Sequence, residues 1–329
     1  MIITKTPFRM SFFGGGTDFP EYYMEHGGAV LSTTFDKYCY VNARHLPRFF
    51  DYSSEFAYST IERVTDLGSV KHPAIRNAVR MLDMREIRLS YEADLPARTG
   101  LGTSSSFAVG MLNAFYSLKG RMKSKRQLAD DAIYLERVLC AESGGVQDQI
   151  AAAFGGFNRI EFSAGGYSVA PVVIDNETKR RLNSSLLLLF TGFSRFSSDI
   201  QADTQKAIKG KASELKEMAS LVYEAEKALA GRSLDDFGRL LDYAWKLKRG
   251  ISGGISNDSI DGLYCKAVKA GALGGKLLGA GGGGFLLFYV EPQRRKSVVD
   301  AMSSLLQVPF SFENAGTQVI YYDAEDYEK

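Results

Sequence analysis

The stretch Leu95-Pro96-Ala97-Arg98-Thr99-Gly100-Leu101-Gly102-Thr103-Ser104-Ser105-Ser106 decides how the rest of the chain is interpreted. Before it, residues 87–93 alternate apolar and polar side chains, which is the period of a half-buried strand. After it, apolar residues recur at helical spacing over residues 107–118. The pattern therefore predicts a strand, then a glycine-bearing loop, then the first turn of a helix.

The composition of this loop suits a phosphate-binding site. The first turn of a helix carries unpaired backbone N–H groups and the positive end of the helix dipole. Gly100 and Gly102 allow a phosphate to approach the backbone, and the hydroxyls of residues 103–106 can add donors or a magnesium ligand. An N-capped helix after a tight turn would use the same residue types. The Walker A pattern is absent, because neither Gly-Lys pair precedes Ser or Thr.

The same stretch resembles the central motif of the GHMP kinases, the galactose, homoserine, mevalonate and phosphomevalonate kinases. That motif reads Pro-x-x-x-Gly-Leu-Gly-Ser-Ser, and here Thr103 replaces its first serine. The resemblance implies that Ser104 binds magnesium. It also implies that the ATP phosphates lie on Gly100, Leu101, Gly102, Thr103, Ser104 and Ser105.

Length and composition favour a globular protein of two domains. The chain has 329 residues, and its formal charge of +2 gives no support for a nucleic acid or an anionic membrane as partner. Cys39, Cys140 and Cys265 are too scattered for a metal site or a disulfide framework, so we expect a reducing cytoplasm. No secretory signal and no membrane-spanning run is visible.

A second glycine-rich segment follows the N-terminal strand at residues 14–16, directly before Thr17 and Asp18. Taken alone, it predicts a hairpin turn. It also resembles the Pro-x-Arg-x-x-x-x-Gly-x-x-Thr-Asp motif of the GHMP sugar kinases, in which this loop holds the sugar. The resemblance implies that Arg9 lies beside the reacting hydroxyl and the γ-phosphate. It also implies that the substrate-binding residues include Gly15, Gly16, Thr17 and Asp18.

The details of this loop bear on the sugar. Galactokinases place Glu-His where this chain has Gly15 and Gly16, which argues against galactose. The Gly-Gly-Gly-Thr-Asp form resembles the bacterial heptose kinases of the family, which phosphorylate D-glycero-D-manno-heptose 7-phosphate at C1.

Two carboxylates complete the predicted site. Asp148 follows Gly-Gly-Val at the head of an alanine-rich segment, where it could simply cap a helix, and a helical glutamate such as Glu136 is usually solvated. By resemblance, Asp148 matches the catalytic aspartate of galactokinases and mevalonate kinases. Glu136 matches their acidic magnesium ligand.

Two further segments contribute candidates. Residues 279–284 satisfy G-x-G-x-x-G, but a strand-like run follows instead of a helix, which argues against a dinucleotide site. The third motif of the GHMP kinases has this form, so Gly281 and Gly282 are predicted to contact ATP. Lys246 and Lys248 end a long predicted helix, where they either complement its dipole or bind a sugar phosphate.

These expectations combine into one architecture. We predict an α+β protein with the two-domain GHMP kinase fold: a ribosomal S5 domain 2-like domain over residues 1–180 and a ferredoxin-like domain over residues 181–329. Residues 29–41 are predicted to form two strands around a turn.

The predicted activity is an ATP- and Mg²⁺-dependent transfer of phosphate to the C1 hydroxyl of a heptose 7-phosphate. The partner is a small sugar, and the oligomeric state is left open. Two alternatives stay open at this stage. One is a fucose- or galactose-type kinase of the same family, and the other is a sensor that binds ATP and sugar without catalysis.

Overall fold

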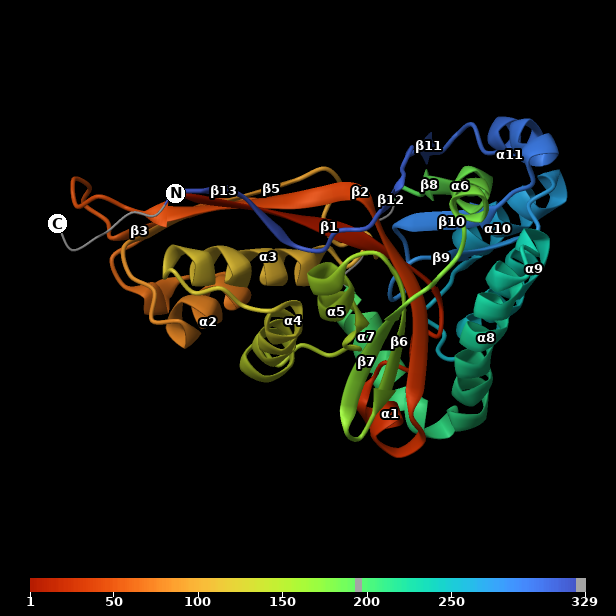
Figure 1. Ribbon diagram of the computed structural model, residues 1–329, viewed down its shortest axis with the longest axis horizontal. Helices are drawn as coiled ribbons and strands as arrows, with labels where there is room; N and C mark the ends of the chain where they lie inside the picture. Colours follow the sequence, from red (N-terminus) through yellow and green to blue (C-terminus); the bar gives the residue numbers. More distant parts are fainter. Residues whose placement is uncertain (193–196, 324–329) are drawn as a thin grey trace.

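The computed structural model describes residues 1–192 and 197–323, which form two sheets with helices packed against them (Figure 1). The larger sheet has nine strands, with β13-β1-β2-β5-β3-β4 along its main path and β6, β7 and β12 joined through β2. The strands are β1 (Ile2–Phe13), β2 (Gly28–His45), β3 (Ser54–Ala57), β4 (Ile61–Val64), β5 (Ile87–Ala93), β6 (Phe157–Ser163), β7 (Gly166–Pro171), β12 (Phe312–Glu313) and β13 (Gln318–Tyr322).

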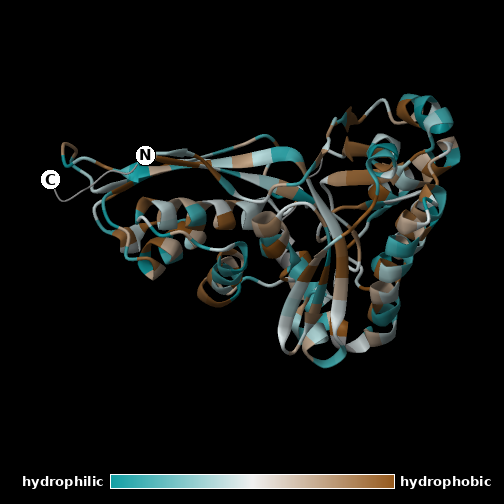
Figure 2. Ribbon diagram, viewed as in Figure 1, coloured by the Kyte–Doolittle hydropathy of each residue, from teal (hydrophilic) through white to brown (hydrophobic). Residues whose placement is uncertain are grey.

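The smaller sheet has four antiparallel strands in the order β11-β8-β10-β9. Its strands are β8 (Leu186–Phe190), β9 (Gly274–Leu277), β10 (Phe285–Tyr289) and β11 (Leu306–Gln307). Figure 2 shows β10 as a hydrophobic strand, and all five of its residues are buried. This sheet and the helices around it make up most of the second half of the chain.

Helices cover both sheets, and α2 to α5 lie along one face of the larger sheet (Figure 1). The α-helices are α1 (Pro20–His26), α2 (Pro73–Met81), α3 (Thr103–Leu118), α4 (Lys125–Ile133), α5 (Gln147–Phe154), α6 (Asn176–Ser185), α7 (Ser197–Ala207), α8 (Ala212–Ala230), α9 (Leu234–Arg249), α10 (Asp258–Ala270) and α11 (Arg295–Ala301). The short helices are η1 (Leu67–Ser69), η2 (Tyr134–Leu139, a π-helix), η3 (Ile208–Gly210) and η4 (Pro292–Arg294). Within residues 1–192 and 197–323, no helix has the length and apolar character that a bilayer crossing requires.

One strand differs from the sequence prediction. Residues 29–41 do not form two strands around a turn, because β2 runs unbroken for 18 residues. It pairs with β1 on one side, and on the other side with β6 at its start and β5 at its end. The β1–β2 register shifts at Pro7/Phe8 and again at Ser11/Phe13. Such irregularities bend a strand pair without a turn, so one long strand serves both ends of the sheet.

The two halves of the chain share a hydrophobic core where β1 ends. Phe12 and Phe13 are fully buried, and their rings lie 5.4 and 5.1 Å from the ring of Phe237 on α9. Aromatic contacts at these distances add to the free energy gained by burying apolar surface. The glycine-rich segment after β1 is therefore anchored against the second half of the chain, which brings residues from both halves to one place.

The C-terminal strands return to the larger sheet. β13 pairs with β1 and β12 pairs with β2, although both follow the smaller sheet in the sequence. The division into residues 1–180 and 181–329 stays a prediction, and the last strands lie in the sheet of the first segment.

Candidate active site

The predicted phosphate loop lies at the start of a helix, as its sequence indicates. Helix α3 begins at Thr103, and Gly102 before it has a positive φ of 73°. The loop packs directly against the third glycine-rich segment. A Cβ added to Gly100 would lie 2.3 Å from the carbonyl oxygen of Leu278, and one added to Gly279 would lie 2.3 Å from Cα of Gly100. The two loops are thus in backbone contact, which side chains would prevent.

Gly100→Ala is expected to destabilise the protein through this contact. Gly100 has φ +83°, and Gly120 has φ +63° with nothing within 4 Å of its added Cβ. Gly120→Ala therefore measures only the cost of holding a residue with a Cβ in the left-handed backbone conformation, which is about 1–2 kcal/mol in the free energy of unfolding. Gly100→Ala adds a clash with backbone atoms, and we expect a total loss of about 3 kcal/mol or more in the free energy of unfolding. Urea unfolding of both variants measures the difference, and equal losses would contradict the contact.

Arg9 and Asp148 form the central ion pair of the site. Arg9 Nε and Nη2 donate to the two carboxylate oxygens of Asp148, each at 2.7 Å. Arg9 Nη1 donates to the carbonyl oxygen of Gly100 at 2.7 Å. Bidentate charged pairs of this kind fix both geometry and orientation. One guanidinium thus joins an acidic side chain on α5 to the glycine loop before α3.

The second glycine-rich segment surrounds a buried aspartate. Asp18 is 2% exposed, and its Oδ1 accepts a hydrogen bond from the backbone N–H of Gly16 at 2.9 Å. Gln147 Nε2 donates to Asp18 Oδ2 at 3.0 Å. Burial raises the pKa of Asp18 despite these hydrogen bonds, and Asp148 adds a smaller effect in the same direction. A Cβ on Gly145 would lie 1.8 Å from Asp18 Oδ2, so this glycine makes room for the carboxylate.

Glu136 occupies a separate buried cluster beside the start of α3. Ser104 Oγ donates to its Oε1 at 3.0 Å, and Ser105 Oγ donates to its Oε2 at 2.7 Å. Gln149 Nε2 donates to the same Oε2 at 2.6 Å. Burial, and then the charge of Glu142, raises the pKa of Glu136 to about 7. The glutamate is therefore buried against the loop hydroxyls, and it is not a solvated helical residue.

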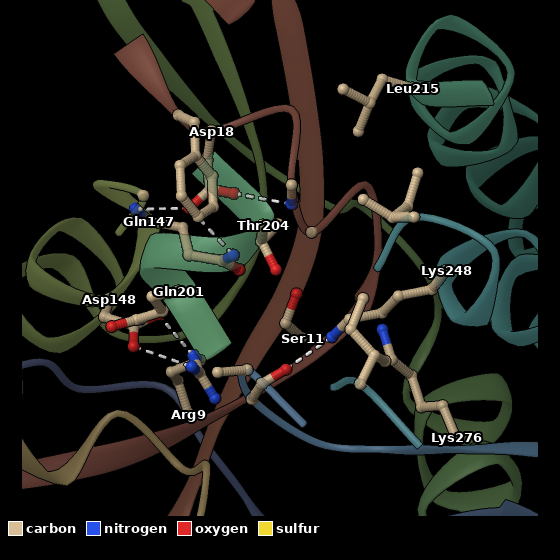
Figure 3. Close-up of a pocket in the computed structure, with 18 residues that line it drawn as sticks. Arg9, Ser11, Asp18, Gln147, Asp148, Gln201, Thr204, Leu215, Lys248 and Lys276 are labelled. Atoms are coloured by element: carbon tan, nitrogen blue, oxygen red, sulfur yellow. Dashed lines mark hydrogen bonds and ion pairs between the residues drawn. The ribbon is translucent and has the colours of Figure 1, made fainter. Parts of the chain in front are cut away.

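The two lysines of α9 differ in position. Lys248 lines the pocket drawn in Figure 3, and its Nζ donates to the carbonyl oxygen of Gly279 at 2.5 Å. Lys246 is 63% exposed and pairs with Asp242 at 2.6 Å. Residues that are two positions apart in a helix are about 200° apart around its axis, so the side chains of Lys246 and Lys248 point in different directions. The sequence predicts that both lysines bind a sugar phosphate, but only Lys248 is among the residues that line the pocket, and Lys246 is exposed outside it.

Figure 3 shows a pocket that several of these elements line, although residues 100–105 and Glu136 are not among its lining residues. Arg9 and Asp148 lie on one side of it, and Lys248 and Lys276 enter from the other. Its lining includes Gly15, Gly16 and Asp18 from the segment after β1, and Gly279 and Ala280 from the third glycine-rich segment.

Several predicted residues lie around this pocket without lining it. Thr17 is buried and bonds to the backbone of Ala29. Gly281 and Gly282 pack on Ile255, and the Gly282 N–H donates to its carbonyl oxygen at 3.1 Å. Their contact with ATP stays a prediction.

Residues that the sequence reasoning missed also contribute to the site. Lys276 on β9 lines the pocket and is 3% exposed, and its Nζ donates to the carbonyl oxygen of Phe12 at 2.7 Å. A lysine within an otherwise apolar and glycine-rich strand was the available signal, because lysine is rarely buried without a partner. Gln147 and Gln149 orient Asp18 and Glu136, and only the three-dimensional structure brings those pairs together.

Comparison with known proteins agrees with this architecture. The family profile described as GHMP kinases N terminal domain matches residues 69–156, and that described as GHMP kinases C terminal matches residues 225–307. A D-glycero-alpha-D-manno-heptose 7-phosphate kinase from Campylobacter jejuni is 32% identical over 315 residues, which cover 92% of this chain and 93% of the relative.

Solved structures give the same result. The crystal structure of a D-glycero-D-manno-heptose 1-phosphate kinase from Bacteroides thetaiotaomicron has a TM-score of 0.79 and 26% identity, with 98% of this chain and 100% of the other covered. A putative sugar kinase from Campylobacter jejuni has a TM-score of 0.71 and 28% identity, with 97% of each chain covered. The predicted α+β fold of two GHMP kinase domains is confirmed. The chain belongs to the GHMP kinase family, and it is therefore a kinase phosphotransferase.

Proposed function

We propose that this protein is an ATP-dependent sugar kinase that phosphorylates the anomeric C1 hydroxyl of D-glycero-D-manno-heptose 7-phosphate and releases the 1,7-bisphosphate and ADP. The names of the similar proteins support a heptose phosphate as substrate. The Gly15-Gly16 pair, in place of the Glu-His of galactokinases, supports a sugar other than galactose.

One observation carries the proposal: the Arg9 guanidinium contacts both the Asp148 carboxylate and the Gly100 carbonyl. The acid that would receive a proton and the loop that would hold ATP phosphates are thus held by one side chain. Each carboxylate oxygen of Asp148 accepts one bond from Arg9 and has lone pairs left for a sugar hydroxyl. The side chain of Asp148 is 21% exposed and lines the pocket, where such a hydroxyl would lie.

The chemistry follows from this arrangement. The C1 oxygen of the sugar attacks the γ-phosphorus of ATP, and the bond from that phosphorus to the bridging oxygen of ADP breaks. The proton of the hydroxyl passes to the Asp148 carboxylate, which acts as general base. Arg9 offsets the negative charge on the transferred group, since phosphoryl transfer depends mainly on electrostatics and alignment. Asp18, Gly15, Gly16 and Thr17 would hold the sugar, and residues 100–105 with Gly281 and Gly282 would hold ATP between the two domains.

A magnesium ion fits the cluster around Glu136. The described residues contain no group of three or more His, Cys, Asp or Glu side chains that could hold a metal ion. Mg²⁺, however, is often held by one or two carboxylates together with substrate phosphates. Glu136 and Ser104 offer oxygen ligands next to the phosphate loop. The buried Glu136 carboxylate has no ion-pair partner among residues 1–192 and 197–323, which favours a cation nearby. When bound, Mg²⁺ would neutralise phosphate charge.

Glu136→Gln is expected to weaken Mg²⁺ binding and to stabilise the metal-free protein at neutral pH. We expect the Mg²⁺ concentration for half-maximal activity to rise by about 10-fold or more. The stability effect follows from the pKa of Glu136, which burial raises to about 7. The unfolded carboxyl releases its proton first, so the wild-type protein loses stability as pH rises from the ordinary glutamate value through about 7. Gln has no such loss.

Thermal unfolding from about pH 5 to about pH 8 in EDTA measures this difference. The Tm of the wild type should fall relative to that of the variant as pH rises, and added Mg²⁺ should raise only the wild-type Tm. Parallel pH curves that respond equally to Mg²⁺ would contradict the role of Glu136.

A coupled ADP-release assay over a panel of sugars and sugar phosphates tests the proposed function. We expect ADP release with D-glycero-D-manno-heptose 7-phosphate. With galactose or fucose, we expect ADP release to be much slower. Faster ADP release with fucose or galactose would identify that sugar as the substrate in place of the heptose phosphate. Binding of ATP and sugar without any release would identify a sensor.

A further inference from the structure

The pocket contains two buried lysines that lie away from the reacting pair. Lys248 on α9 and Lys276 on β9 both line it, and in Figure 3 both enter from the side opposite Arg9 and Asp148. Each Nζ donates one hydrogen bond to a backbone oxygen, that of Gly279 for Lys248 and that of Phe12 for Lys276. A lysine ammonium has three donors, so two remain on each side chain.

Neither lysine has an ion-pair partner in the described part of the chain. Of the carboxylates that line the pocket, Asp148 is bound to Arg9, and Asp18 accepts its hydrogen bonds from Gly16 and Gln147. Burial is the main reason that the pKa of Lys248 is lowered to about 8 and that the pKa of Lys276 is lowered well below the ordinary lysine value. Repulsion by the positive charge of Arg9 also lowers the pKa of each lysine. Burying two such cations is unfavourable unless an anion joins them.

A third polar group lies in the same pocket without a partner. Ser11 is 6% exposed, and its Oγ is a buried atom with no hydrogen-bond partner in the residues described. An orphaned buried hydroxyl is uncommon in proteins and calls for a ligand or a water molecule. Ser11 lies on β1, one residue before Phe12, whose carbonyl oxygen binds Lys276. The two lysines and this hydroxyl therefore bring more hydrogen-bond donors into this part of the pocket than the surrounding protein groups accept.

We propose that Lys248, Lys276 and Ser11 form the subsite for the phosphate that the acceptor sugar carries before the reaction. This inference rests on the proposed function, because it places a second phosphate of the substrate. Lys276 is bound to the end of β1, which leads directly into the loop expected to hold the sugar. In the ring form of the sugar, C1 and C5 flank the ring oxygen, and C6, C7 and the 7-phosphate extend outward from the ring at C5. With C1 at Asp148, this arm can carry the 7-phosphate across the pocket to the side where Figure 3 shows Lys248 and Lys276.

The same donors could instead bind a phosphate of ATP. Lys248 contacts Gly279, whose backbone packs on Gly100 of the phosphate loop. The two sources of phosphate differ in a measurable way. A subsite for the acceptor phosphate discriminates between phosphorylated and unphosphorylated sugar, whereas a subsite for nucleotide phosphate changes ATP binding equally with either sugar.

Lys276→Met and Lys248→Met test the subsite, with Lys246→Met as the matched control. Lys246 lies on the same helix as Lys248 but is exposed and away from the pocket. Methionine is apolar and similar in length, so it should be tolerated where the lysine is buried, and a Tm at or above that of the wild type verifies folding. Calorimetry without nucleotide measures the Kd for D-glycero-D-manno-heptose 7-phosphate, and steady-state assays measure KM for ATP.

We expect each pocket variant to bind the sugar 7-phosphate about 10- to 100-fold more weakly, as the loss of a charged hydrogen bond predicts. The KM for ATP should change by no more than about 2-fold, and Lys246→Met should match the wild type. A rise in KM for ATP with unchanged sugar affinity would assign the lysines to the nucleotide. Unchanged values for both ligands would overturn the subsite altogether.

The proposed function and the subsite can fail separately in this experiment. A wild type that binds the sugar 7-phosphate through these lysines but releases no ADP would overturn the kinase reaction and leave the subsite standing. A wild type that phosphorylates the sugar, with variants that bind it equally well, would overturn only the subsite. Restoration of binding in Lys276→Arg, which returns the charge, would support a direct contact with the phosphate.

Discussion

Asp148→Asn is expected to lower kcat by about 10²-fold or more while leaving ATP affinity nearly unchanged. The amide keeps the size of the carboxylate but does not accept the proton of the attacking hydroxyl. ATP affinity should persist, because the predicted phosphate loop lies on α3 and Asp148 lies on α5. Steady-state kcat for the heptose 7-phosphate, with the Kd for ATP from equilibrium binding, measures both effects.

A matched control separates this effect from a general loss of charge. Asp236→Asn removes an exposed carboxylate that pairs with Arg239 on the outside of α9, and kcat should stay within about 2-fold of the wild type. Full turnover in Asp148→Asn would refute the role of Asp148 as general base. Equal losses of kcat and of ATP affinity would point to a collapsed site instead.

Arg9→Met is expected to produce the second-largest effect, a fall in kcat of about 10²-fold. Arg9 is 4% exposed and supplies three hydrogen bonds, two to Asp148 and one to the Gly100 carbonyl. Removing it takes away the charge beside the transferred phosphate and the group that orients the base. Arg9→Lys keeps the charge but not the planar fork, so its kcat should fall between those of the wild type and Arg9→Met.

The double variant Arg9→Met/Asp148→Asn distinguishes a shared role from two separate ones. Because the two side chains form one hydrogen-bonded unit, the double loss in kcat should be close to the larger single loss. Losses that multiply would contradict the joint role of the pair. Single-turnover measurements on all three variants separate the chemical step from product release.

Local patterns in the sequence predict a good part of this fold. The alternation over residues 87–93 and the helical spacing over residues 107–118 agree with β5 and α3. The Ser-x-x-Gln pattern at Ser124 and Gln127 has the form of a capping box, and this capping box is present at the start of α4. These features depend on neighbours in the sequence, which is why a pattern reveals them. The continuity of β2 depends on partners that are distant in the sequence, such as Phe162 opposite Gly28, so a local pattern does not reveal it.

The site is partly predictable for the same reason. Arg9 and Asp148 are 139 residues apart in the sequence, and only the resemblance to the GHMP kinases indicates that they act together. Helical geometry predicts that Lys246 and Lys248 point in different directions, but which of the two faces the pocket depends on how α9 packs against β9. Lys276 and Ser11 carry no motif. Within the described residues, Lys276 is buried without an ion-pair partner and Ser11 Oγ is buried without a hydrogen-bond partner, and both are properties of the folded protein.

The position of the new phosphate tests the central claim most directly. ³¹P NMR of the product from wild-type protein, ATP and D-glycero-D-manno-heptose 7-phosphate resolves a phosphate on the anomeric carbon from one on any other hydroxyl. The proposed function predicts a 1,7-bisphosphate in amounts equal to the ADP released. A product phosphorylated elsewhere, or no phosphoryl transfer to the sugar at all, would contradict it.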